Sequence, residues 1–230
     1  MTARTLATDD FNRANNADLG AAWDATNGQN AMQITANCAQ QATIGADNGE
    51  SNNSVAFPND QWSEAVFGPN VKADGVGTGY GPAVRMTSDG SLTHYRMIGS
   101  GAGYELVRHL AGASLSLSSG AGTTFAAADA LYLEFVGSTP VHKKNGAPFG
   151  APTSNSAIAG GRAGVCYSST EAVASDGITS WQAGDFVAEV LPLEIPRPVR
   201  RFQFERFMNE EEAFPSELDP RTWCEELATA

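Results

Sequence analysis

Few side chains in this sequence are spaced for catalysis. Cleavage of a glycosidic bond needs two carboxylates that flank the bond. Glu64 stands alone on its predicted strand, and Glu189 and Glu194 lie five residues apart across a proline. His94 and Tyr95 are types that an elimination reaction can use, but neighbours on a strand point to opposite faces of the sheet. We therefore expect no catalytic residue, and a protein that acts by binding.

Metal ligands are equally sparse. The three cysteines, Cys38, Cys166 and Cys224, are far apart and form no CxxC pair, so we predict free thiols and no zinc site. The histidines also lack the spacing of transition-metal ligands. Calcium needs only oxygen ligands from a loop, and the oxygen-rich run 47–53 is one candidate, although a polar turn explains it as well. We expect no cofactor, with calcium at 47–53 as the open alternative.

Three residues are candidate glycan contacts. Trp62 shares one face of the predicted strand 61–67 with Glu64 and Val66, and an aromatic ring can stack on a sugar. Arg85 and Arg96 follow on nearby predicted strands. The alternative for Trp62 is a place in the core, where most large aromatic residues of a sandwich lie.

These side chains depend on a chain of short strands. Apolar and polar residues alternate in five segments, and Asn-Gly or Asp-Gly pairs, which are typical hairpin turns, separate many of them. The plainest hairpin runs from residue 131 to residue 150, with turns at 137–138 and 145–146. Almost no helical periodicity is present, so the pattern predicts an all-β, two-sheet jelly-roll sandwich. The alternating segments are 61–67, 81–86, 94–98, 104–108 and 130–136.

The composition limits the kinds of partner that we expect for this protein. The 230 residues carry a formal net charge of -12 and only 17% charged residues. An acidic surface repels phosphate backbones, so we do not expect nucleic-acid binding. The first residues have no apolar signal region, and no run of about 18 apolar residues could cross a membrane. We expect a protein that is made in a cytoplasm without a signal peptide and does not enter a membrane.

The composition changes at Pro192, and we predict a jelly-roll domain over 1–194 and a docking arm over 195–230. The arm joins basic and acidic clusters with large aromatic side chains, which are costly to leave in water at roughly 1.5–3 kcal/mol each. Its end, from Asp219, favours a short helix with Pro220 in the first turn. A disordered tail is the alternative. The candidate partner-binding residues of the arm are Arg200, Arg201, Phe202, Phe204, Phe207 and Trp223.

Several segments resemble concanavalin A-like, laminin-G-like jelly-roll domains, of the kind found in phage structural proteins. The opening run 9–13, with Leu19, Gly20 and Trp23, looks like the first strand of these domains. The segment 161–165 resembles their late Gly-Arg turn into a strand, and 181–186 resembles the closing strand that returns beside the first. The likeness covers about 8–190 and implies the fold, whereas this fold serves many functions.

Taken together, the residues predict a non-catalytic virion structural protein of a tailed phage, either a capsid decoration or a tail component. Its arm would bind other virion proteins or sister subunits in a homo-oligomer, and its sandwich could bind cell-surface glycans. The alternative is a secreted carbohydrate-binding or carbohydrate-cleaving domain.

Overall fold

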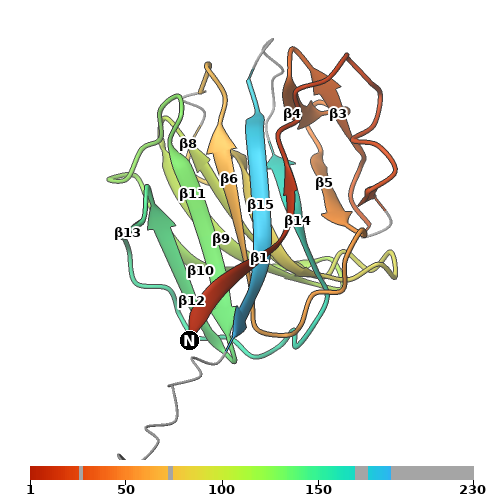
Figure 1. The fold of residues 1–230 in the computed structure, drawn as a ribbon. Helices are drawn as coiled ribbons and strands as arrows, with labels where there is room; N and C mark the ends of the chain where they lie inside the picture. The colour runs from red at the N-terminus through yellow and green to blue at the C-terminus, as the bar shows by residue number, and fades with distance from the viewer. Residues whose placement is uncertain (26–27, 72–74, 169–175, 188–230) are drawn as a thin grey trace, which may run out of the picture. The chain divides into compact units, whose positions relative to one another are not determined.

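The computed structural model describes residues 1–25, 28–71, 75–168 and 176–187. Every regular element in these residues is a β-strand, and the strands form two antiparallel sheets that pack face to face (Figure 1). The all-β, two-sheet jelly-roll sandwich predicted from the sequence is confirmed. None of the described segments forms a helix that could cross a membrane.

The first sheet has eight strands, with β1 paired to β15 beside the main order β13-β12-β11-β6-β15-β4-β3. Neighbours in this sheet come from distant parts of the chain, since β6 lies between β11 and β15. Its strands are β1 (Thr2–Asp9), β3 (Met32–Thr35), β4 (Cys38–Gln41), β6 (Gln61–Phe67), β11 (Ala130–Val136), β12 (Thr139–Lys144), β13 (Ala147–Pro148) and β15 (Ile178–Val187).

The second sheet has seven strands in the order β10-β9-β8-β7-β14-β5-β2. Four of them, β7 to β10, follow one another as hairpins, whereas β14 inserts between β7 and β5. Its strands are β2 (Trp23–Asp24), β5 (Asp47–Asn52), β7 (Gly79–Met86), β8 (His94–Ser100), β9 (Gly103–Leu110), β10 (Ala113–Gly120) and β14 (Arg162–Ser168).

The core lies between the sheets and is built by the period-two alternation of the strands. On β11, the side chains of Leu131, Leu133 and Phe135 are fully buried, so Tyr132 and Glu134 point to the outward face. Aromatic contacts join the layers: the rings of Tyr95 and Phe135 stack at 4.1 Å, and those of Trp23 and Trp181 meet edge to face at 4.8 Å.

Strand β1 passes very close to β15. Thr5 pairs with Gly184, and a Cβ atom at Gly184 would lie 1.7 Å from the carbonyl oxygen of Arg4. Figure 1 shows β1 crossing in front of β15. Glycine is therefore required at this point, because any side chain would push β1 away from the sheet. The sequence prediction that the closing strand returns beside the first is confirmed.

One predicted turn is wrong. The polar run that begins at Asp47 forms strand β5, which is almost wholly buried in the second sheet. Its polar side chains find hydrogen-bond partners: Asn48 bonds to the backbone of Thr43 in the preceding turn, and the carboxyl group of Glu50 accepts the N–H of Met32 at 2.8 Å. Burial raises the pKa of Glu50 to about 7. Hydrogen bonding, rather than apolar character, thus permits this strand inside the sheet.

Candidate functional site

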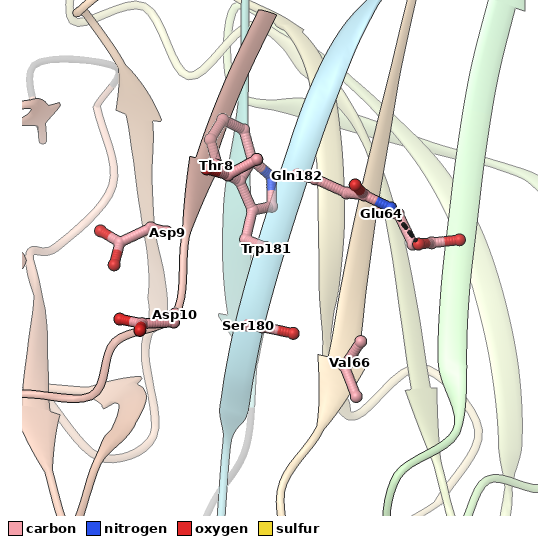
Figure 2. Close-up of a pocket in the computed structure, with 8 residues that line it drawn as sticks. All are labelled: Thr8, Asp9, Asp10, Glu64, Val66, Ser180, Trp181 and Gln182. Atoms are coloured by element: carbon pink, nitrogen blue, oxygen red, sulfur yellow. Dashed lines mark hydrogen bonds between the residues drawn. The ribbon is translucent and has the colours of Figure 1, made fainter. Parts of the chain in front are cut away.

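A shallow hollow lies on the outward face of the eight-stranded sheet, where the end of β1 meets β15 and β6 (Figure 2). Its volume is about 570 Å³. Most of its lining side chains carry oxygen or nitrogen, and they are Thr8, Asp9, Asp10, Glu64, Val66, Ser180, Trp181 and Gln182. We call this hollow the groove.

Strand pairing lines up one side chain from each of five strands across this face. Thr8 pairs with Gln182, Gln182 with Glu64, Glu64 with Tyr132, and Tyr132 with Lys143. Neighbouring strands lie roughly 4.8 Å apart, so this polar row spans about 19 Å from β1 to β12. The row presents in turn a hydroxyl, an amide, a carboxylate, a phenol and an ammonium group, which together donate and accept hydrogen bonds.

Contacts within the polar row and with the nearby Glu134 hold its side chains in place. The amide of Gln182 donates to the carboxylate of Glu64 at 2.7 Å (Figure 2). The hydroxyl of Tyr132 donates to Glu134 at 2.6 Å, and the ammonium of Lys143 lies 3.2 Å from the same carboxylate and 4.4 Å from the centre of the Tyr132 ring. Burial and the bond to Glu134 raise the pKa of Tyr132, so its phenol stays protonated and keeps its proton on the bond to Glu134.

Trp62 supports the polar row by packing against Tyr132. Its ring stacks on Tyr132 with centroids 5.6 Å apart, and its indole N–H donates to the carbonyl of Asp185 at 3.2 Å. It pairs across the strands with Gly184, which leaves room for the indole. Only 4% of Trp62 is exposed, so in this structure it braces Tyr132. Its predicted contact with a glycan stays a prediction.

Asp9 lies at one corner of the groove, and its carboxylate is held by hydrogen bonds within the fold. Its carboxylate accepts two bonds from Arg13, the indole N–H of Trp23 and the backbone N–H of Phe11, at 2.6–3.0 Å. Burial would raise the pKa of Asp9, but these bonds outweigh it and hold the pKa below its ordinary value. The adjacent Asp10 is exposed. This one carboxylate therefore joins Phe11, Arg13 and Trp23 of the opening run.

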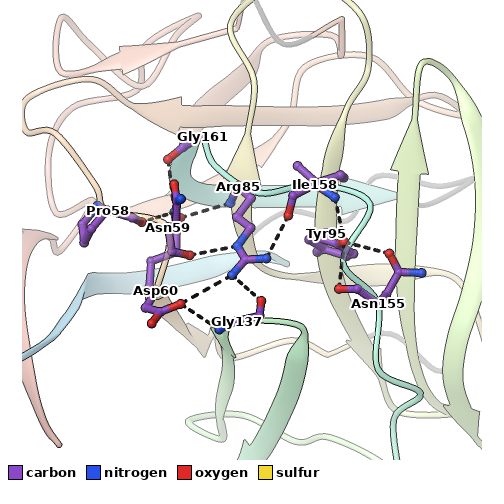
Figure 3. A network of polar contacts seen from close by, with 10 residues as sticks. Pro58, Asn59, Asp60, Arg85, Tyr95, Gly137, Asn155, Ile158 and Gly161 are labelled. Carbon is purple, nitrogen blue, oxygen red and sulfur yellow. Dashed lines mark hydrogen bonds and ion pairs between the residues drawn. The ribbon is translucent and has the colours of Figure 1, made fainter.

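Arg85, the second predicted glycan contact, is buried and does not line the groove. Figure 3 shows its polar contacts. Its guanidinium donates to the carbonyls of Asn59, Ile158 and Gly137 at 2.7–2.9 Å, and it lies 5.0 Å from the centre of the Phe135 ring. These partners belong to three separate loops. The structure gives Arg85 a role in joining the loops at one end of the sandwich.

Arg96, the third predicted contact, lies on the outward side of the seven-stranded sheet and is also buried. It forms an ion pair with Asp47 at 2.7 Å. Beside it, the rings of His94 and His109 stack at 4.8 Å, and neither ring nitrogen of His94 has a hydrogen-bond partner among the described residues. Burial lowers the pKa of both histidines, that of His109 to about 4. The expected opposite orientation of His94 and Tyr95 is confirmed, since Tyr95 lies in the core.

The calcium candidate at 47–53 is not a loop, because β5 takes up most of it. Asp47 is paired with Arg96, and Glu50 points to Met32. Over the described ranges, no three acidic, histidine or cysteine side chains are grouped to hold a metal ion. Cys38 and Cys166 are buried, whereas Cys224 lies outside the described residues, and the free thiols stay a prediction. Calcium binding stays a prediction.

The arm cannot be compared with its prediction. All six of its candidate partner-binding residues, the proposed terminal helix and the boundary at residue 194 lie outside the described residues. The groove residues were only partly foreseen. Alternation places Glu64 on the outward face beside Trp62, but nothing local to β15 or β1 announces that Gln182 and Thr8 continue the same row.

Comparison with known proteins gives structural likenesses alone. No family model matches the chain, and no curated protein matches its sequence. Among solved structures, the chain is similar to the carbohydrate-binding module CBM66 from Bacillus subtilis, with a TM-score of 0.49 and 17% identity over 71% of this chain and 92% of that module.

Two further solved structures are similar at lower identity. One is the exoplasmic/lumenal domain of VIP36 in a Ca²⁺/Man-bound form, with a TM-score of 0.49 and 9% identity over 74% of this chain and 85% of that one. The other comes from a study of endo-acting O-glycanases of the human gut microbiota, with a TM-score of 0.45 and 8% identity over 80% of this chain and all of that one. Likenesses this distant carry no function over to this chain.

Proposed function

We propose that this protein binds carbohydrate along the polar row of the eight-stranded sheet. The observation that carries the proposal is the strand register, which sets the hydroxyl of Thr8, the amide of Gln182 and the carboxylate of Glu64 side by side along the open hollow, with the polar row continuing beyond it. A polyhydroxylated chain offers a donor and an acceptor at each hydroxyl, so it can satisfy such a row by hydrogen bonds. This supports the alternative that the sequence left open, a carbohydrate-binding domain.

The proposed binding is non-catalytic. Of the three carboxylates that line the groove, Asp9 is held by Arg13 and Trp23, and Glu64 is held by Gln182. A glycosidase needs one carboxylate as acid and a second as base or nucleophile across the bond, and only Asp10 of this set is free of a side-chain partner among the described residues. The cleaving alternative predicts turnover of a bound oligosaccharide that Glu64→Gln abolishes.

Binding can be tested by calorimetric titration with a panel of neutral and charged oligosaccharides. We expect Gln182→Ala to weaken binding about fivefold, because it removes one amide from the row. The matched control is Gln33→Ala, which removes an amide bonded to the carbonyl of Gln41 on β4, away from the groove. Equal losses in both variants, or no binding to the panel at all, would contradict the proposal.

Display of this module on a phage particle is a separate proposal that rests on the sequence alone. The aromatic and charged arm over 195–230 would dock on other virion proteins or on sister subunits, and the module would then be carried on the virion. Deleting 196–230 from the full chain tests it: we expect a folded protein that still binds carbohydrate and no longer joins its assembly. Retained assembly would show that the arm is not the docking element, and loss of folding would make the arm a structural part of the domain.

A further inference from the structure

The charges around the groove are not balanced. Most carboxylates on this side of the molecule have a cationic partner: Asp9 has Arg13, Asp185 has Arg4, and Glu134 has Lys143. Glu64 and Asp10 form no ion pair within the part of the chain that the structure describes. The only cation of the polar row, Lys143, is already neutralised. Two carboxylates without a salt bridge among the described residues therefore face the groove, and one of them, Glu64, lies in the centre of the row.

Glu64 is placed to act on a ligand. It is the third of five members of the polar row, it is half-buried, and the amide of Gln182 holds one of its carboxylate oxygens at 2.7 Å. Fixing a side chain in advance lowers the entropy cost of binding. Partial burial also weakens the screening of its charge by salt. A ligand that crosses the row must pass this carboxylate.

On the basis of the carbohydrate binding proposed above, we infer that the groove selects glycans with free amino groups, and that Glu64 is the specificity-determining residue. An ammonium on the sugar pairs with the Glu64 carboxylate, whereas a neutral sugar gains only an ordinary hydrogen bond there. A uronate or sulfate meets like charge at Glu64 and Asp10 and is repelled. The net charge of -12 adds to the attraction of cations.

Three matched ligands test this selection: the tetrasaccharides of glucosamine, N-acetylglucosamine and galacturonate, titrated at about pH 6, where an amine keeps its proton. We expect the glucosamine chain to bind about fivefold more tightly than its acetylated form, and the galacturonate chain to bind most weakly. The preference should shrink in about 0.5 M salt, which screens the charges.

Glu64→Gln keeps the size of the side chain and removes its charge, so we expect it to bring the glucosamine and N-acetylglucosamine affinities within about twofold of each other. Glu105→Gln is the control, because Glu105 is a half-buried carboxylate on β9 of the other sheet; it should leave the preference intact. Unfolding midpoints of both variants confirm that the fold is unchanged.

The outcomes separate the two proposals. If Glu64→Gln weakens all three ligands equally, the polar row binds sugar but selection by charge is wrong. Tightest binding of the galacturonate chain would also overturn the selection. Absence of binding to any of the three would overturn both the selection and the proposed function.

Discussion

Asp9 shows how much of this fold can depend on one side chain. It joins the end of β1 to Arg13 and to the indole of Trp23, so the loop between β1 and β2 is tied to the core. We predict that Asp9→Ala lowers the free energy of unfolding by about 3 kcal/mol, because it leaves buried donors without an acceptor. Urea denaturation measures the loss. The neighbouring exposed Asp10→Ala is the control and should cost less than about 1 kcal/mol.

A second prediction for a single residue concerns Arg85, which can either stabilise the fold or contact a ligand. Its planar guanidinium reaches three carbonyls in different directions, which the single ammonium of lysine cannot do. We expect Arg85→Lys to lower stability by about 2 kcal/mol and to leave the affinity for carbohydrate unchanged. A large loss of affinity in the folded variant would instead restore Arg85 as a glycan contact.

At the scale of elements, β1 depends on the absence of a side chain at Gly184. An added methyl group would meet the carbonyl oxygen of Arg4, so Gly184→Ala must displace β1 from β15. We predict a loss of about 3 kcal/mol together with weaker carbohydrate binding, since Thr8 is carried by β1. Gly122→Ala is the matched control, because a Cβ at Gly122 meets nothing within 4 Å. Equal stability of the two variants would contradict the close approach of β1.

The sequence predicted where individual strands lie better than it predicted which strands pair with each other. Segments 61–67 and 130–136 are strands with the predicted bounds, because each alternates cleanly between core and surface. Strand β5 was missed, since its residues are polar and Glu50 is satisfied by the distant Met32, whereas Asn48 bonds to the turn just before the strand. The polar row was missed for a related reason. Alternation assigns a face to Glu64, but only the pairing of β6 with β11 and β15 shows which side chains stand beside it.

The whole molecule carries an unusual set of buried titratable groups, which predicts its response to acid. His94, His109 and His142 are all buried, and burial lowers the pKa of each, those of His109 and His142 to about 4. The unfolded chain then takes up protons from about pH 6.5 downward while the folded chain does not. Stability must therefore fall as the pH falls from 7 towards 4.

Protonation of Glu50 has the opposite effect on the stability of the fold. Its pKa of about 7 in the folded state means that the folded chain takes up this proton first, so acidification from pH 7 to pH 5 stabilises the fold. The contribution is about 2 kcal/mol, similar in size to the loss from one histidine. The stabilisation from one carboxyl group is smaller than the loss from three imidazoles, so we expect a net loss of stability by pH 5. Urea denaturation across this pH range measures it.

Two substitutions separate these contributions. Glu50→Gln removes the group whose protonation stabilises the folded chain. The loss in the free energy of unfolding between pH 7 and pH 5 should therefore be larger by about 2 kcal/mol. His142→Phe places a neutral ring among the rings of Tyr104 and Phe149, where His142 now lies, and should flatten the loss by a similar amount. If both variants keep the slope of the original chain, the buried groups do not govern the acid response, and ordinary surface carboxylates must do so instead.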